Sequence, residues 1–248
     1  LLLLIIVEVV MCVVCRNLYA VNPWPGPCPT KASILQDIPE PYRADVLILN
    51  PGEISEQNVR RFCALHAMNG VVAKGSECNT SGQGVRIFPA PVDTAAVLRA
   101  VSSRSVGARS DTLILQERLL GTEYGINVAK KPDWKVHRIV AISDTTQNRV
   151  CHGHGEYNEK NKQSCPERGD FIDKAHLYTR GLEDAVGIVA NHLPGFYYGR
   201  YDVMAQSDAH LSRGEFKVIE VNGSNSGFLG GAVLPDVQKE NWKKWRNW

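Results

Sequence analysis

Polar residues alternate with apolar ones in two strand-like segments near the C-terminal end of the sequence. The first segment contains Arg200 and Asp202, and the second contains Glu220 and Asn222. Side chains two positions apart on a strand share a face, so neighbouring strands would bring Asp202, Glu220 and Asn222 together as oxygen donors. Arg200 would stand beside them. Oxygen ligands of this kind suit a Mg²⁺ ion that also holds phosphate oxygens. The alternative is an antiparallel hairpin whose polar face simply meets water.

A second candidate for chemistry is the segment 74–84, where a strand ends in Lys74 and a loop rich in Gly, Ser, Asn and Thr follows. Small residues such as Ser76, Ser81 and Gly82 let backbone N–H groups approach phosphates closely, and the lysine supplies a point charge. The segment is not a Walker A loop, because its lysine precedes the glycines. Taken alone, it is more often an ordinary glycine-rich hairpin.

A third candidate is the segment 115–123, where a strand ends, the chain turns near Gly121, and Glu123 opens the next strand. Such a hinge offers backbone groups and the side chain of Gln116 to the edge of an adenine base. Glu123 would then accept hydrogen bonds from ribose hydroxyls. The alternative is a simple bend with exposed charge.

These segments must be positioned by a mixture of strands and helices. Apolar runs and alternation predict strands at residues 45–49, 71–74, 112–117, 124–129, 135–143, 198–204 and 216–221. Helical periodicity predicts helices at residues 55–69, 94–101 and 171–192, the first with Ser55 as its N-cap and Gly70 at its C-terminal stop. Residues 150–170 are polar and rich in turn formers. The order favours an α+β fold over a regular alternation of strands and helices.

In this order, the segments resemble the ATP-grasp superfamily, which includes D-alanine:D-alanine ligases, over roughly residues 22–230. The residues that match the superfamily pattern are, in turn, Lys31, Lys74, Gln116 with Gly121-Thr-Glu123, Arg200 with Asp202, and Glu220 with Asn222. Segments 20–23, 30–39, 196–202 and 214–223 look more narrowly like a group of ATP-grasp proteins whose members often carry apolar N-terminal segments. The resemblance implies a fold in which two α+β subdomains clasp ATP between them.

The resemblance also implies a role for each matched residue. Lys31 and Lys74 would bind phosphates, with Ser76, Ser81 and Gly82 in a loop that closes over them. Gln116, Glu117 and Leu119 would hold adenine, and Glu123 the ribose. Asp202, Glu220 and Asn222 would hold Mg²⁺, for which Mn²⁺ can substitute. Arg200 and Lys74 would be the catalytic residues, and Arg138 would reach toward the phosphates.

The implied activity is that of an ATP-dependent ligase, which joins a small-molecule carboxylate to an amine or another nucleophile. Two other functions stay open: a nucleotide-binding protein without turnover, and a membrane-associated interaction module that keeps the fold. Ligases of the D-alanine type follow the Glu-x-Asn motif with a Pro-Gly turn, whereas this chain continues as Asn222-Gly-Ser-Asn-Ser-Gly227. The acceptor pocket therefore need not be theirs.

Composition sets apart an apolar segment at residues 1–22 and a Trp/Lys-rich tail at 236–248. For the residues between them, the resemblance implies a lid subdomain at 23–118 and a subdomain with the metal site at 119–235. The apolar run 1–15 would span about 22 Å as a helix, which is shorter than a hydrocarbon core of about 30 Å. A membrane-facing piece, a buried strand or helix, and a signal peptide are the alternatives. The resemblance favours membrane contact.

Composition excludes some functions. The net charge is only +2, from 28 basic and 26 acidic residues, so the sequence lacks the excess of basic residues that is typical of nucleic-acid binding. The cysteines are odd in number and irregularly spaced, which indicates reduced thiols and a protein in the cytoplasm or on the cytoplasmic face of a membrane. Cys151, His154 and Cys165 match no standard zinc spacing, and a solvated loop is the preferred interpretation.

Overall fold

The computed structural model describes residues 30–52, 54–76, 85–103, 112–129, 137–145 and 172–222. Predictions for Ser81, Gly82, the polar stretch 150–170 and the terminal segments 1–22 and 236–248 lie outside these residues. Within the described ranges, no helix has the length and apolar character needed to cross a membrane.

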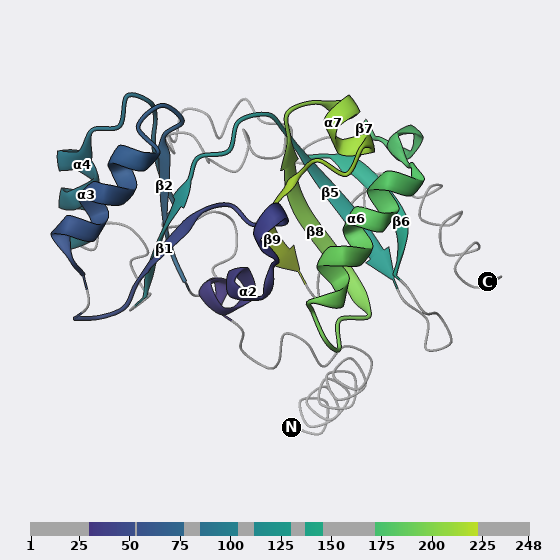
Figure 1. Cartoon of the computed structure of the whole chain (residues 1–248), viewed down its shortest axis with the longest axis horizontal. Coiled ribbons are helices and arrows are strands. Elements are labelled where there is room, and N and C mark those ends of the chain that lie inside the picture. The colour runs from purple at the N-terminus through teal and green to yellow at the C-terminus, as the bar shows by residue number, and fades with distance from the viewer. Residues whose placement is uncertain are drawn as a thin grey trace, which may run out of the picture.

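Two antiparallel sheets form the framework of the chain (Figure 1). The first has the order β1-β4-β2-β3, with β1 at Val46–Leu49, β2 at Val71–Gly75, β3 at Arg86–Phe88 and β4 at Leu113–Glu117. The second has the order β7-β6-β5-β8-β9, with β5 at Thr122–Ala129, β6 at Arg138–Asp144, β7 at Ile172–Asp173, β8 at Tyr198–Ala205 and β9 at Lys217–Asn222. This mixture of helices and antiparallel sheets confirms the predicted α+β class.

Two helices cover one side of the first sheet (Figure 1). They are α3 (Glu56–Leu65) and α4 (Thr94–Ser102), and each begins at a polar cap. The Ser55 hydroxyl accepts from an N–H of the first turn of α3, and Asp93 does the same for α4. Their apolar faces meet the strands in a core built from residues such as Val59, Phe62, Val71, Val97 and Leu115.

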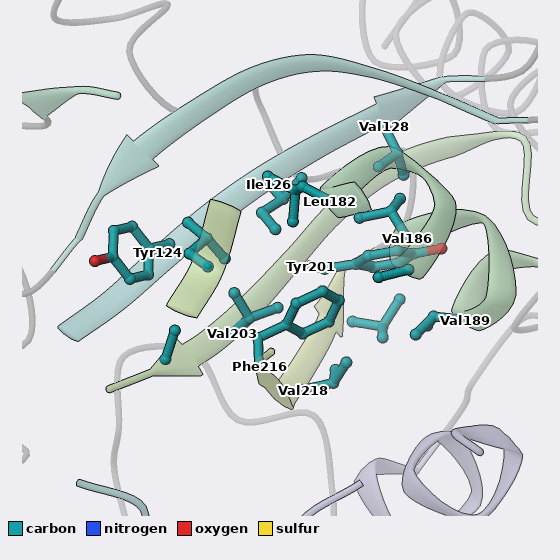
Figure 2. Packing of buried hydrophobic residues seen from close by; sticks show 14 of the residues in the cluster. Tyr124, Ile126, Val128, Leu182, Val186, Val189, Tyr201, Val203, Phe216 and Val218 are labelled. Atoms are coloured by element: carbon teal, nitrogen blue, oxygen red, sulfur yellow. The ribbon is translucent and has the colours of Figure 1, made fainter. Parts of the chain in front are cut away.

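The second sheet packs one face against α6 (Arg180–Asn191). Figure 2 shows this core, in which Tyr124 and Ile126 of β5 and Tyr201 and Val203 of β8 lie under Leu182 and Val186 of the helix. Because side chains alternate along a strand, the residues between these core positions must face the opposite side. The core therefore fixes which residues of β5, β8 and β9 reach the other face.

A short helix, α2 (Lys31–Asp37), contacts both sheets (Figure 1). A capping box between Thr30 and Ser33 defines its start. Ile34 joins the core of the second sheet, and Leu35 packs against Ile114 of β4 in the first sheet. The 3₁₀ turn η1 (Glu40–Tyr42) follows. α2 thus ties the two sheets together through apolar contacts.

Several predicted boundaries were wrong. The helix predicted at 55–69 ends at Leu65, because a turn follows that leads to Gly70 at a φ of 101°. The helix predicted at 171–192 begins only at Arg180, since Thr179 caps it and the preceding residues form β7 and the turn η4 (Ala175–Leu177). The short elements α2, β3 and α7 (Asp208–Ser212) were missed.

Gly199 is required by the close approach of β9 to β8. A Cβ atom at this position would lie 2.2 Å from the Asn222 carbonyl oxygen and 2.7 Å from the ring of Phe196. We expect Gly199→Ala to lower the free energy of unfolding by about 2 kcal/mol, as overpacked sites do. A urea unfolding midpoint measures this change.

Gly187→Ala is the matched control, because a Cβ on this residue of α6 would meet nothing within 4 Å. We expect the control to raise the free energy of unfolding by about 0.5–1 kcal/mol, since alanine favours the helix. Equal effects of the two substitutions would contradict the close approach of the strands.

Candidate active site on the second sheet

The polar residues of β8 and β9 meet on the face of the second sheet that α6 leaves uncovered. The strands pair so that Arg200 lies opposite Asn222 and Asp202 opposite Glu220, with a bulge after Asp202. Tyr201 between them points into the core instead. The structure therefore brings together all four residues that the alternation pattern singled out.

Hydrogen bonds hold this group in a defined arrangement. Arg200 donates from Nε to Asp202 Oδ1 at 2.6 Å and from Nη2 to Oδ2 at 3.0 Å, a two-pronged ion pair. The Asn222 side-chain amide donates to the same Oδ2 at 2.8 Å. Asp202 is 8% exposed, so its carboxylate depends on these partners for charge compensation.

Burial and charge act in opposite directions on the ion pair. Burial raises the pKa of Asp202 above its usual range, although the Arg200 charge and the hydrogen bonds work against this shift. For Arg200, burial acts to lower the pKa, but the carboxylates of Asp202, Glu220 and Glu123 outweigh it and leave the pKa raised. The guanidinium therefore stays charged amid a cluster of carboxylates.

The neighbouring strand β5 continues this polar face. Its residues Glu123, Gly125 and Asn127 lie opposite Met204, Asp202 and Arg200 of β8, respectively. Glu123 is the residue predicted to hold ribose, and its charge acts on Arg200. Asn127 was missed by the sequence analysis. The signal was a single amide between Ile126 and Val128 in an otherwise apolar run.

The predicted phosphate-binding residues of the first sheet lie at the end of β2 and the start of α2. Lys74 is 8% exposed and sits opposite Ile114 of β4. Ser76 is buried, and its carbonyl oxygen accepts from the Lys31 N–H at 2.6 Å. The Ser76 hydroxyl accepts from the Ala32 N–H at 3.2 Å. Ser76 thus places Lys31 directly beside the end of β2.

The predicted adenine-binding residues occupy the link from β4 to β5. Gln116 is buried in β4, and Leu119 is partly buried in the link. The Glu117 carboxylate accepts from the Asp45 N–H at 3.0 Å, and its other oxygen lies 3.9 Å from His66 Nδ1. The side chain of Glu117 is therefore engaged by Asp45 and His66, and its backbone N–H donates to the Asp45 carbonyl oxygen at 2.9 Å.

Arg138 does not join the cluster around Asp202. Its guanidinium donates to Glu183 at 2.8 Å, and Glu183 is a buried residue of α6. Tyr178 donates to the same carboxylate oxygen at 2.9 Å. Arg138 is thus occupied in compensating a buried charge, and the role suggested for it at the phosphates has no support in its contacts.

Comparison with solved structures finds several ligases of similar fold. D-alanine–D-alanine ligase from Bacillus anthracis gives a TM-score of 0.54 at 14% identity, over 85% of this chain and 61% of that one. D-alanyl-alanine synthetase A from Vibrio cholerae gives 0.53 at 15% identity, over 83% and 56%. The ATP-grasp ligase PsnB, complexed with a minimal precursor, gives 0.51 at 17% identity, over 83% and 55%. The chain has the ATP-grasp fold.

The ATP-grasp fold predicted from the order of the motifs is thereby confirmed. The chain spans between 55% and 61% of the length of these three ligases. No protein-family model and no curated protein matches the sequence. At this level of sequence identity, the structural similarity shows the fold of the chain. The activity of the chain must be argued from the candidate site.

The ion pair of the candidate site generates a prediction about stability and pH. Without Arg200, the buried Asp202 carboxylate would be left with the Asn222 amide as its remaining bonded partner. We expect Arg200→Gln to lower the free energy of unfolding by about 3 kcal/mol at pH 7, the typical cost of an uncompensated buried charge. Chemical unfolding at a series of pH values measures it.

The sign of the pH dependence follows from the raised pKa of Asp202. A carboxyl whose pKa is higher in the folded chain destabilises it when ionised, and this cost fades as the pH falls through the folded pKa. The loss in Arg200→Gln should therefore shrink at acidic pH. The control Arg60→Gln, which breaks an exposed pair with Glu56, should cost about 0.5 kcal/mol or less. A loss in Arg200→Gln that does not change with pH would contradict the assignment.

Proposed function

We propose that the chain binds ATP with Mg²⁺ and activates a carboxylate as an acyl phosphate for attack by an amine or another nucleophile. The observation that carries the proposal is the convergence of Asp202, Glu220 and Asn222 beside Arg200 on the face of the second sheet opposite α6. In an ATP-grasp fold this face is where a metal–nucleotide complex would be expected, as the resemblance implied.

The residues present fit a hard divalent cation. Two carboxylates and an amide oxygen are ligands of the kind that Mg²⁺ prefers, and Mn²⁺ accepts the same set. Asp202 is largely buried, so a cation there would replace the compensation that Arg200 now gives. When bound, the metal would supply neutralisation of phosphate charge.

The nucleotide would extend along β5 and β8 from the link between the sheets. The backbone of Glu117 and Leu119 would meet adenine together with Gln116, and Glu123 would accept from the ribose. Lys31 and Lys74 would hold phosphates, with Ser76, Ser81 and Gly82 as the surrounding loop. D-alanine–D-alanine ligase from Bacillus anthracis has been solved in complex with ATP, and its similar fold, with a TM-score of 0.50 at 14% identity, supports ATP as the nucleotide.

The chemistry assigned to the chain is binding, orientation and charge stabilisation. A carboxylate oxygen of the substrate attacks the γ-phosphorus, its bond to the phosphorus forms, and ADP leaves. A nucleophile then attacks the acyl carbon and phosphate leaves. Arg200 stabilises the oxyanion of this second step, and Lys74 assists at the phosphates. No protein nucleophile is required.

The substrates proposed are a small-molecule carboxylate and an amine, and no nucleic acid. The proposed location is the cytoplasm or the cytoplasmic face of a membrane. Contact with a membrane through residues 1–15 stays a prediction, because these residues lie outside the described part of the chain.

Calorimetric titration of the purified chain with ATP, with and without Mg²⁺, tests the proposal. The native chain should bind ATP in a Mg²⁺-dependent way. Asp202→Asn/Glu220→Gln should weaken binding of Mg-ATP by at least about 100-fold, because two of its metal ligands lose their charge.

Glu215→Gln is the matched control, since this exposed carboxylate lies just before β9 and pairs with Arg213. It should bind Mg-ATP as the native chain does. Binding of equal strength in the native chain and the double variant would reject the metal site. Binding without ADP release, across carboxylates and amines, would favour a nucleotide-binding protein without turnover.

A further inference from the structure

Asn127 is a buried amide on the proposed catalytic face that lacks hydrogen-bond partners. Its side chain has 0% exposure, and neither Nδ2 nor Oδ1 has a hydrogen-bond partner in the described part of the chain. An unpaired buried polar group is costly to keep, and an apolar residue of the same size would avoid that cost. The amide is therefore expected to have a use that the folded chain alone does not satisfy.

The neighbours of Asn127 on this face are small, with one exception. Gly125 and Ala129 flank it along β5, and Ala141 lies opposite it on β6. On the other side stands Arg200 of β8, whose guanidinium is drawn toward Asp202. A ligand would reach the buried amide only after the larger side chain of Arg200 moves, and such rotamer changes on binding are common.

Its place along β5 assigns Asn127 to the end of the site where group transfer would occur. Glu123, the proposed ribose ligand, lies four residues earlier on the same face, which is about 13 Å along a strand. Gly125 lies between them, opposite the proposed metal ligand Asp202. Seen from Glu123, Asn127 lies on the far side of the proposed metal site. It is next to Arg200, where the acyl group of the substrate would be held.

We infer that Asn127 binds the backbone of a peptide-like carboxylate substrate, at the residue adjacent to the reacting carboxylate. This inference rests on the proposed function. The side-chain amide offers one acceptor and two donor hydrogens. In an extended peptide the N–H and C=O of a single residue point to the same side, as they do in a strand ladder, and therefore match both atoms of the amide.

Other groups fit this position less well. A charged group beside a neutral, buried amide would lack compensation, because the Arg200 charge is already shared among Asp202, Glu220 and Glu123. A purely apolar group would leave the amide unpaired. A peptide-like segment satisfies both atoms of Asn127 and adds no charge.

The test uses N-acetylated dipeptide acids and their counterparts in which an ester oxygen replaces the N–H of the first residue, which precedes the residue that carries the reacting carboxylate. Hydroxylamine serves as the nucleophile: its nitrogen bonds to the acyl carbon, phosphate leaves, and the hydroxamate is measured together with ADP. In the native chain the ester should lower kcat/KM about tenfold, because one hydrogen bond is lost. In Asn127→Leu the two compounds should differ less than about twofold.

Thermal unfolding of the same variant gives a reading that does not depend on substrate. Because leucine removes the unpaired amide at nearly constant volume, Asn127→Leu should raise the unfolding temperature. Asn127→Asp keeps the size and the acceptor oxygen but loses the donor hydrogens, so it should lower kcat/KM for both compounds and keep the preference for the amide. Asn191→Leu, at the exposed end of α6, controls for a general effect of the substitution and should leave the preference intact.

The outcomes separate this inference from the proposed function. A lower unfolding temperature for Asn127→Leu, or an amide preference that survives in it, would overturn the inference. Turnover of other acids but of no peptide-like acid would overturn it too. Turnover of no acid at all, with Mg²⁺-dependent ATP binding intact, would overturn the proposed activation of a carboxylate and this inference with it. Failure of the native chain to bind Mg-ATP would instead remove the proposed function itself.

Discussion

The pairing of β8 with β9 is the constraint on which the candidate site depends. Its register sets Arg200 opposite Asn222 and Asp202 opposite Glu220, and the apolar residues between them are fixed in the core under α6. A slip of one residue would turn every one of these side chains to the other face. The buried core therefore specifies the position of the polar groups, although it contains none of them.

A second constraint is the contact of α2 with both sheets. Ile34 and Leu35 are neighbours in sequence, yet they enter different apolar clusters because successive residues on a helix point in different directions. The same helix begins at Lys31, whose N–H donates to the backbone oxygen of Ser76 just after β2. The end of β2 and the core of the second sheet are thus both in contact with this one short helix. The proposed nucleotide would lie against both of the sheets that α2 contacts.

The sequence predicted the fold class, most strands and the grouping on β8 and β9, because alternation over several residues is a strong local signal. It failed where the deciding contact is distant. The start of α6 depends on Thr179 as a cap and on β7 pairing with β6, which no local pattern shows. The engagement of Arg138 with Glu183 is a contact across 45 positions. Asn127 was missed because its significance lies in lacking a partner, which a sequence cannot display.

Charge compensation connects the resting site with the proposed chemistry. Asp202 is buried too deeply to remain ionised without a positive partner, and Arg200 with the Asn222 amide now fills that need. A cation at the proposed metal site would take over this role, because it meets the same carboxylate. Arg200 would then be released at the position beside Asn127, where the developing oxyanion is expected. In the proposed mechanism, the arginine that stabilises the site before binding would therefore also stabilise the reaction, and it would take these two roles one after the other.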